Sequence, residues 1–138
     1  MIKKVTFETG ANAFFNSIKE KVDLYFSEKK IDPAGNRKLY IKSGILVSIS
    51  LSIYCVLIFI APVPWVSIGL CILLGLVLSA IGFNVMHEGG HQSFSRHHWL
   101  NQVSAYFLNV LGGNTYYWKI KHNINHHTYT NIEGIDSD

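Results

Sequence analysis

Residues Ser43–Met86, SGILVSISLSIYCVLIFIAPVPWVSIGLCILLGLVLSAIGFNVM, contain no Asp, Glu, Lys or Arg. As a single helix rising about 1.5 Å per residue, this stretch would be roughly 66 Å long, about twice the hydrocarbon thickness of a bilayer. Pro62 and Pro64 fall near its middle, where a helix should stop and turn. We therefore predict two membrane-spanning helices, about Gly44–Ile60 and Trp65–Phe83, joined by a tight loop.

The composition of the whole chain also favours a membrane protein. Of its 138 residues, 49% are hydrophobic and only 15% are charged, and the mean hydropathy is +0.20. Soluble domains usually carry about a quarter charged residues. A pair of buried core helices would leave too little chain to cover them in water. The predicted fold class is an all-α membrane protein: a two-span transmembrane hairpin followed by helices at the cytoplasmic face that carry the histidines.

The basic residues predict how the hairpin is oriented. Nine of the twelve Lys and Arg residues lie in the first 42 positions, and the loop between the two spans has none. Since Lys and Arg are enriched in cytoplasmic loops, we expect the N-terminus and, after two spans, the histidines to be cytoplasmic. The net charge of +3 then reflects topology and contact with anionic headgroups. No aromatic and basic pattern indicates nucleic-acid binding.

The chain is expected to have three regions. Residues 1–42 form an amphipathic cytoplasmic region, residues 43–86 the transmembrane hairpin, and residues 87–138 a cytoplasmic histidine region. In the first of these, apolar residues recur at helical spacing from Ala11 to Phe26, with charged residues between them. This helix is expected either on the membrane surface or packed against the rest of the cytoplasmic domain. Asp32–Asn36 should end it.

All seven histidines follow the hairpin, and five of them form two clusters. Residues four apart share one face of a helix, so His87 and His91 can aim at one point, and so can His122 and His126. His127 lies about 100° round from His126 and could reach a second point nearby. Five imidazoles suit a transition metal better than acid–base catalysis, which rarely needs more than one or two.

These residues alone leave the metal open. Structural zinc sites usually recruit Cys, whereas an all-imidazole set favours a redox metal such as iron, with zinc and copper as alternatives. Haem would use one or two of the histidines and leave the rest unexplained. His97 and His98 lie in a polar turn without a partner four residues away, so we expect neither to be a ligand. Between the clusters, apolar spacing predicts one short helix over Trp99–Leu111, and Asn114 should cap the next helix.

Both clusters and their flanks resemble the membrane-bound fatty acid desaturases with histidine boxes. The flanks are most similar to bacterial acyl-lipid or acyl-CoA desaturases related to the front-end type, and the resemblance runs from about Asp32 to the end of the chain. The segments that carry it are His87–His91, Ser93–Ser95, Trp99–Asn101, Leu111–Gly113, and His122–Asn131 followed by Gly134 and Asp136.

The resemblance implies an enzyme that uses O₂ and a non-haem di-iron centre to introduce a cis double bond into an acyl chain. By analogy His87, His122 and His127 would bind one iron, and His91 and His126 the other, with no further catalytic residue. The Glu88 carboxylate would either orient an imidazole or be solvated. The implied partners are an acyl-lipid or acyl-CoA substrate, the lipid bilayer (a bacterial inner membrane), and a separate ferredoxin or cytochrome as electron donor.

One departure from the family pattern concerns the third histidine box. The family carries this box after another pair of spans, and the sequence to Asp138 contains neither. We therefore expect the N-terminal part of a longer enzyme, or a truncated gene product, inactive by itself. The alternatives are another histidine-box membrane enzyme, such as an alkyl or sterol hydroxylase or a carotenoid-modifying oxygenase, and a non-catalytic membrane metal-binding protein.

Overall fold

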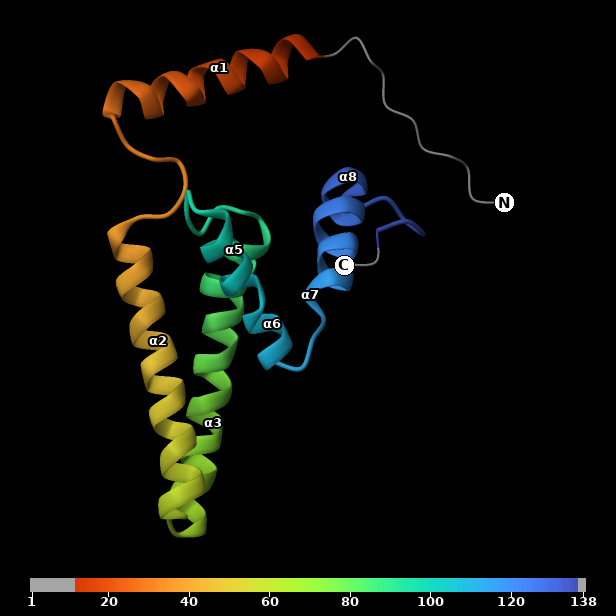
Figure 1. Ribbon diagram of the computed structural model, residues 1–138. Helices are drawn as coiled ribbons and strands as arrows, with labels where there is room; N and C mark the ends of the chain where they lie inside the picture. Colours follow the sequence, from red (N-terminus) through yellow and green to blue (C-terminus); the bar gives the residue numbers. More distant parts are fainter. Residues whose placement is uncertain (1–11, 137–138) are drawn as a thin grey trace. The chain divides into compact units, whose positions relative to one another are not determined.

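The computed structural model describes residues 12–136, and every regular element in that range is helical (Figure 1). This confirms the predicted all-α class. The chain divides after Pro33 into two compact units. Residues 1–11 and 137–138, which fall in the predicted N-terminal and histidine regions, lie outside the described residues.

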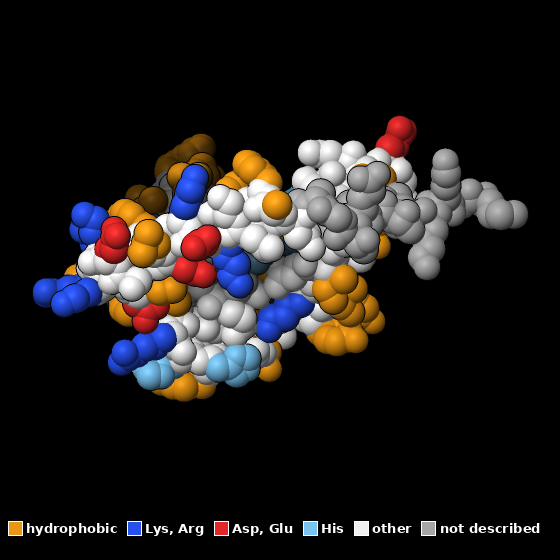
Figure 2. Space-filling model, turned by 90° about the horizontal axis from the view of Figure 1, so that it is seen from above, with side chains coloured by type: hydrophobic (Ala, Val, Ile, Leu, Met, Phe, Trp, Pro, Cys, Tyr) orange, Lys and Arg blue, Asp and Glu red, His pale blue; other side chains and the backbone are white. Residues whose placement is uncertain are grey.

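The first unit contains helix α1, Asn12–Lys29. It ends shortly before Asp32–Asn36, the segment predicted to end it, where Lys30 adopts a left-handed φ of 52°. The N–H groups of Lys30 and Ile31 then bond to the carbonyls of Ser27 and Phe26, both at 3.2 Å, which satisfies the last turn of the helix. No residue of α1 is buried in its unit. Hydrophobic side chains and charges of both signs lie side by side along it (Figure 2).

The second unit begins with two long helices that lie side by side (Figure 1). Helix α2, Arg37–Cys55, continues through the π-helical turn η1, Val56–Ile60. Helix α3, Pro64–Ile81, continues through η2, Gly82–Met86, and α4, His87–Gly90.

Both continuous helices, Arg37–Ile60 and Pro64–Gly90, are long and apolar enough to cross a membrane. The mean hydropathy of their apolar windows is 2.4 and 2.5, and only 11% of each window is buried within the protein. Core helices of a soluble protein would be mostly buried, so this low burial favours contact with lipid instead.

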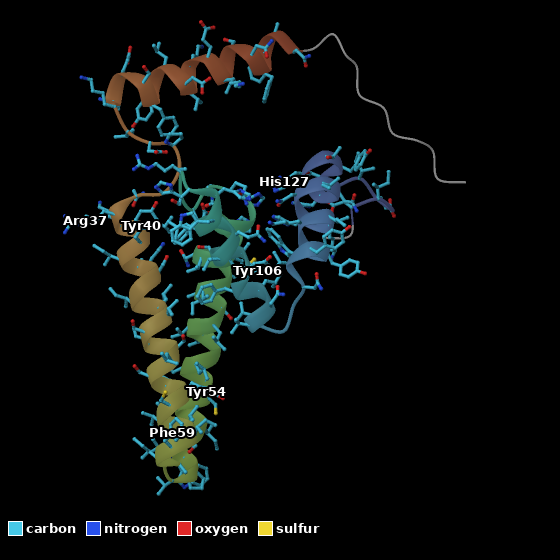
Figure 3. The ribbon with its side chains drawn as sticks, in the orientation of Figure 1. Arg37, Tyr40, Tyr54, Phe59, Tyr106 and His127 are labelled. Carbon is cyan, nitrogen blue, oxygen red and sulfur yellow. The ribbon has the colours of Figure 1, made fainter. Side chains whose placement is uncertain are left out.

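The turn between the two helices falls where the prolines predict it. Ala61 has a left-handed φ of 45°, and Pro64 occupies the first turn of α3, where its missing N–H costs no hydrogen bond. Figure 3 shows Tyr54 and Phe59 toward this turn, whereas Arg37 lies at the opposite end of α2. The helices extend beyond the predicted spans at that opposite end, because neither Arg37–Lys42 nor the segment after Phe83 contains a helix breaker.

The start of α2 is bonded to the segments around the first histidine pair. The Asn36 side chain caps α2 by accepting the Leu39 N–H at 2.9 Å, and the Gly35 N–H donates to the Ser93 carbonyl at 2.9 Å. Lys42 Nζ donates to Asn84 Oδ1 at 2.6 Å across the hairpin. These contacts fix the register of the two helices where α3 leads into the histidines. The buried core lies at the same end and consists of Val77, Ile81, Val85 and Phe94.

The single helix predicted over Trp99–Leu111 is wrong, because the structure has two helices there. They are α5, His98–Ala105, and α6, Phe107–Val110. In a continuous helix the Ala105 carbonyl would accept the Asn109 N–H. Instead the Thr115 hydroxyl lies 3.1 Å from that carbonyl and also contacts Asn109 Oδ1, and the Asn109 N–H turns to the Tyr106 carbonyl at 2.9 Å.

The second histidine cluster lies on the last helical segment, which runs through α7, Thr115–Trp118, η3, Lys119–His126, and α8, His127–Tyr129. Asn114 caps it as predicted, because its side chain accepts the N–H groups of the second and third residues that follow, at 3.0 and 3.1 Å. The middle of the segment is a π-helix, in which hydrogen bonds span five residues instead of four.

Candidate metal centre

The first histidine pair lies at the end of the helix that begins at Pro64. The Nε2 atoms of His87 and His91 are 3.3 Å apart, and their ring centroids are separated by 4.4 Å. Both side chains are half-buried. The spacing of four residues on a helix therefore brings the two imidazole nitrogens to one point, as the sequence predicts.

The second cluster contributes His122 and His127 to the same place. The His122 ring lies 5.2 Å from that of His87 and 5.1 Å from that of His91, and the His127 ring lies 4.8 Å from that of His91. One ring nitrogen from each of His87, His91 and His122 lies within 4.8 Å of the other two. The two boxes therefore face each other although about thirty residues separate them in the sequence.

His126 lies to one side of this group and packs on His122. The two rings are stacked, with centroids 5.2 Å apart and planes at 17°. The stacked rings agree with the spacing of four residues predicted for an α-helix. The π-helix η3 brings a second residue to the same face of His122: the His127 N–H bonds to the His122 carbonyl, and those two rings are 4.9 Å apart.

The His126 ring has its own anionic partner. Its Nδ1 lies 3.1 and 3.0 Å from the two carboxylate oxygens of Asp136. Asp136 was expected only as part of a flanking pattern, because it lies ten positions from His126. The loop that brings the two together could not be predicted from helical spacing.

Two glycines allow the boxes to approach each other closely. A Cβ on Gly89 would lie 2.6 Å from the Ala105 nitrogen and 2.7 Å from the Asn101 carbonyl oxygen, so α5 packs directly on this backbone. A Cβ on Gly90 would overlap the Trp118 indole. The pair of glycines within the first box was the sequence signal for this close approach.

Trp118 and Asn123 join the second box to the first. The Trp118 ring stacks on the His122 imidazole, with centroids 4.5 Å apart and planes at 22°. The Asn123 amide donates to the Gly90 carbonyl at 2.8 Å. Trp118 was predicted to be an interfacial anchor and Asn123 had no predicted role, because helical spacing does not show which residues lie between the boxes.

The remaining two histidines, His97 and His98, lie outside this group. The Nδ1 atom of His98 is 2.7 Å from Gln92 Oε1, and Arg96 Nε donates to His97 Nε2 at 3.3 Å. Both His97 and His98 are exposed. Their contacts are those of a surface turn.

Burial and the neighbouring imidazoles keep His91 neutral. Burial is the largest cause that lowers the His91 pKa to about 4, and the charges that His87, His122 and His127 would carry lower it further. At neutral pH the His91 ring therefore keeps a lone pair for a metal. Glu88 is engaged by the Ser93 hydroxyl, which donates at 2.7 Å, while its nearest approach to His87 Nδ1 is 3.9 Å, too long for a hydrogen bond.

The donor geometry fits a transition metal. Two nitrogens bound at about 2.1 Å and roughly 90–109° apart would be separated by about 3.0–3.4 Å. The observed separation of 3.3 Å between the Nε2 atoms of His87 and His91 falls in this interval. An all-imidazole donor set suits iron, zinc or copper better than a hard cation such as Mg²⁺.

The profile of the family described as "Fatty acid desaturase" matches residues 63–138, which include both histidine boxes and more than half of the chain. The chain belongs to the fatty acid desaturase family. It is similar to the sn-1 linoleoyl-lipid 6-desaturase of Arthrospira platensis, with 36% identity over 133 residues, which are 96% of this chain and 36% of that protein.

Two further relatives of this desaturase-family chain also match most of it, but only over part of their own length. The sn-1 linoleoyl-lipid 6-desaturase of Synechocystis sp. is 31% identical over 128 residues, 93% of this chain and 36% of that protein. An acyl-lipid (8-3)-desaturase of Physcomitrium patens is 24% identical over 125 residues, 91% of this chain and 26% of that protein. The chain thus spans about a third of the length of the relatives it matches best among these. No solved structure matches it significantly.

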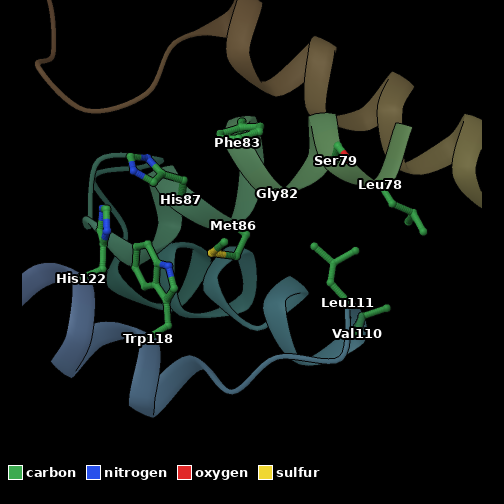
Figure 4. Close-up of a pocket in the computed structure, with 10 residues that line it drawn as sticks. All are labelled: Leu78, Ser79, Gly82, Phe83, Met86, His87, Val110, Leu111, Trp118 and His122. Atoms are coloured by element: carbon green, nitrogen blue, oxygen red, sulfur yellow. The ribbon is translucent and has the colours of Figure 1, made fainter. Parts of the chain in front are cut away.

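An apolar pocket of about 650 Å³ adjoins the histidines of this desaturase-family chain. His87 and His122 lie at one end of it, beside Trp118, and Val110 and Leu111 lie at the other (Figure 4). Its volume is in the range of small-molecule sites. An apolar ligand in this pocket would therefore have one end beside the imidazoles.

Proposed function

We propose that this chain supplies the membrane hairpin and five metal ligands of an acyl desaturase that introduces a cis double bond into an acyl chain with O₂. The observation that carries the proposal is the convergence of the two histidine boxes beside an apolar pocket, in a chain of the desaturase family. A histidine-bound pair of iron ions would supply the oxidising chemistry with O₂ that removes two hydrogens from an unactivated chain.

The proposed ligands are the five box histidines. Their mutual ring contacts, the neutral state of His91 and the approach of two Nε2 atoms to 3.3 Å support this set. The proposal depends on membership of the set and not on how the ligands divide between the two irons. The set is His87, His91, His122, His126 and His127.

The proposed substrate is an acyl-lipid or acyl-CoA. The pocket beside His87 and His122 has a mostly apolar lining, which includes Leu78, Met86 and Leu111. An alkyl chain gains free energy on leaving water for such a lining and offers it no hydrogen bonds. The names of the related acyl-lipid desaturases favour a lipid-bound acyl chain.

The proposed setting is a bacterial inner membrane, with the N-terminus and both histidine boxes on the cytoplasmic side. The division into residues 1–42, 43–86 and 87–138 describes the regions before, within and after the membrane. A separate ferredoxin or cytochrome would deliver electrons to the cytoplasmic side. The two apolar helices and the uncharged loop between them support this arrangement.

The test compares two histidine substitutions in the intact protein. His126→Ala should abolish the unsaturated product, because a methyl group cannot replace a metal-bound imidazole. His98→Ala is the matched control and should keep most of the activity, because its ring bonds to Gln92 outside the group. Acyl-chain profiles from cells with equal protein levels give the result. Equal loss of activity in both variants would show that the ligand set is wrong. A hydroxylated product in place of an unsaturated one would show that the enzyme is a hydroxylase and not a desaturase.

A further inference from the structure

The carboxylate of Asp136 contacts the His126 ring. Its two oxygens lie 3.1 and 3.0 Å from His126 Nδ1, and Oδ2 also accepts the Asn131 N–H at 2.8 Å. The side chain of Asp136 is only 8% exposed, and that of His126 is 28% exposed. This carboxylate is therefore held in place by a second donor and largely shielded from water.

The loop between the two residues is ordered by several hydrogen bonds. The Thr130 hydroxyl donates to the His126 carbonyl at 2.6 Å, and Asn131 adopts a left-handed φ of 61° that turns the chain back. The N–H groups of Ile135 and Asp136 both bond to the Ile132 carbonyl. The loop thereby returns the carboxylate to the helix end that carries His126.

An ionised carboxylate only accepts hydrogen bonds, which has a consequence for the imidazole. A neutral His126 beside Asp136 must carry its proton on Nδ1, and its lone pair then lies on Nε2. A hydrogen bond of this kind also fixes the orientation of the ring and makes the other nitrogen more basic.

We propose that Asp136 is a positioning residue that holds His126 in the Nδ1–H tautomer, with Nε2 presented to a metal ion. The proposal rests on the proposed function, because it assumes that the box histidines bind metal. Glu88, the acidic residue of the first box, has no comparable geometry toward a histidine among the described residues.

Charge and shape can be separated with two matched substitutions. Asp136→Asn keeps an oxygen for the Asn131 N–H but introduces an amide that can donate as well as accept, so it no longer fixes the tautomer of His126. Glu133→Gln makes the same change of charge at an exposed position of the same loop and is the control.

Two measurements on the intact protein in detergent test the proposal. The first is ¹⁵N NMR of histidine-labelled, metal-free protein, with the His126 signal assigned from its loss in His126→Ala. The second is retention of Fe(II) against a graded chelator, with the thermal midpoint of the metal-free protein recorded for each variant.

We expect the wild-type protein and Glu133→Gln to show the Nδ1–H tautomer at His126, and Asp136→Asn to show a mixture. Asp136→Asn should weaken Fe(II) retention by about 10–100-fold while the metal-free midpoint stays near that of the wild type. In the His126→Ala background, Asp136→Asn should cause no further loss of Fe(II).

The failures of the two proposals differ. An Nε2–H tautomer at His126 in the wild type would overturn the role of Asp136. The role would also be overturned if Asp136→Asn lowered the thermal midpoint of the metal-free protein but left Fe(II) retention unchanged, because Asp136 would then serve only to close the loop. If the tautomer is Nδ1–H but the wild type binds no histidine-dependent Fe(II), the proposed function fails and the positioning of the ring by Asp136 stands.

Discussion

Gly90→Ala tests the contact that joins the two histidine boxes. An alanine Cβ at this position would overlap Cζ3 of the Trp118 indole and lie 2.8 Å from its Cη2. Ordinary contact begins near 3.4 Å, so the ring must retreat by at least 0.6 Å, the difference between 3.4 and 2.8 Å. Trp118 stacks on His122 at 4.5 Å, and its displacement therefore moves a proposed ligand.

The size of the effect follows from this displacement. Metal–ligand distances tolerate changes of only about 0.2 Å, and overpacking of this kind costs about 1–3 kcal/mol. Because Trp118 can shift more freely when the histidines hold no metal, we expect much of this cost to appear in metal binding. Gly90→Ala should then retain Fe(II) roughly 5–150-fold more weakly than the wild type.

The assay is iron per chain after a chelator challenge of the intact protein, with Gly75→Ala as the control. A Cβ at Gly75 meets nothing within 4 Å, so this variant should bind iron like the wild type. Adding Trp118→Phe to Gly90→Ala should restore part of the iron, because the phenyl ring lacks the indole atoms that the methyl overlaps. Gly89→Ala, which meets the backbone of α5, should not be rescued by Trp118→Phe.

Two results would refute this reasoning. The first is a Gly90→Ala protein that retains iron as well as Gly75→Ala does. The second is a double variant whose loss of iron equals the sum of the losses in Gly90→Ala and Trp118→Phe. Additive losses would mean that the two residues are not in contact.

Two other predictions concern topology and the hydrogen bond between the boxes. Reporter fusions after Lys30 and after Gly113 should give cytoplasmic signals and a fusion after Val63 an external signal, because nine of the twelve Lys and Arg residues lie in the first 42 positions; a cytoplasmic signal at Val63 would contradict the hairpin. Asn123→Leu should lower the free energy of unfolding by about 0.5–1.5 kcal/mol, since the bond from its amide to the Gly90 carbonyl is lost, whereas Asn125→Leu in the same helix should change it less. Thermal or denaturant unfolding in detergent measures the free energy for each variant. Equal losses in Asn123→Leu and Asn125→Leu would show that the bond to Gly90 does not stabilise the protein.

The hairpin could be predicted because it depends on properties that are local in the sequence. A long stretch without charge must avoid water wherever it folds, and Pro62 and Pro64 interrupt the hydrogen bonds of any helix that contains them. The same holds for the Asn114 cap, which acts on the next few N–H groups. None of these features requires knowledge of distant residues.

The break at Tyr106 could not be predicted, because the side chain that contacts it comes from a residue ten positions after Ala105. Spacing of apolar residues favours one continuous helix, whereas the Thr115 hydroxyl lies within hydrogen-bond distance of both the Ala105 carbonyl and Asn109 Oδ1, on either side of the break. The packing of α5 on Gly89 belongs to the same class of tertiary contact.

The contacts within each histidine pair could be predicted from helical spacing, but the place of His127 could not. His87 and His91 meet on the α-helix α4, and His122 and His126 stack on each other, whereas the His127 ring comes within 4.9 Å of His122 on the π-helical segment. The partner of His126 depends on a loop whose path no periodicity describes.

The helix that runs from Pro64 to Gly90 has a mechanical consequence. Its apolar part and the first histidine pair belong to one continuous rod, so no flexible linker separates the bilayer from the imidazoles. When a bilayer is thinner or thicker than the apolar part, such a rod tilts or slides to keep that part in hydrocarbon. The second box lies on a different helix but is joined to the rod by the Asn123 amide on the Gly90 carbonyl. A tilt or shift of the rod is therefore passed to the second box through this contact, and lipid chain length becomes linked to the position of the imidazoles.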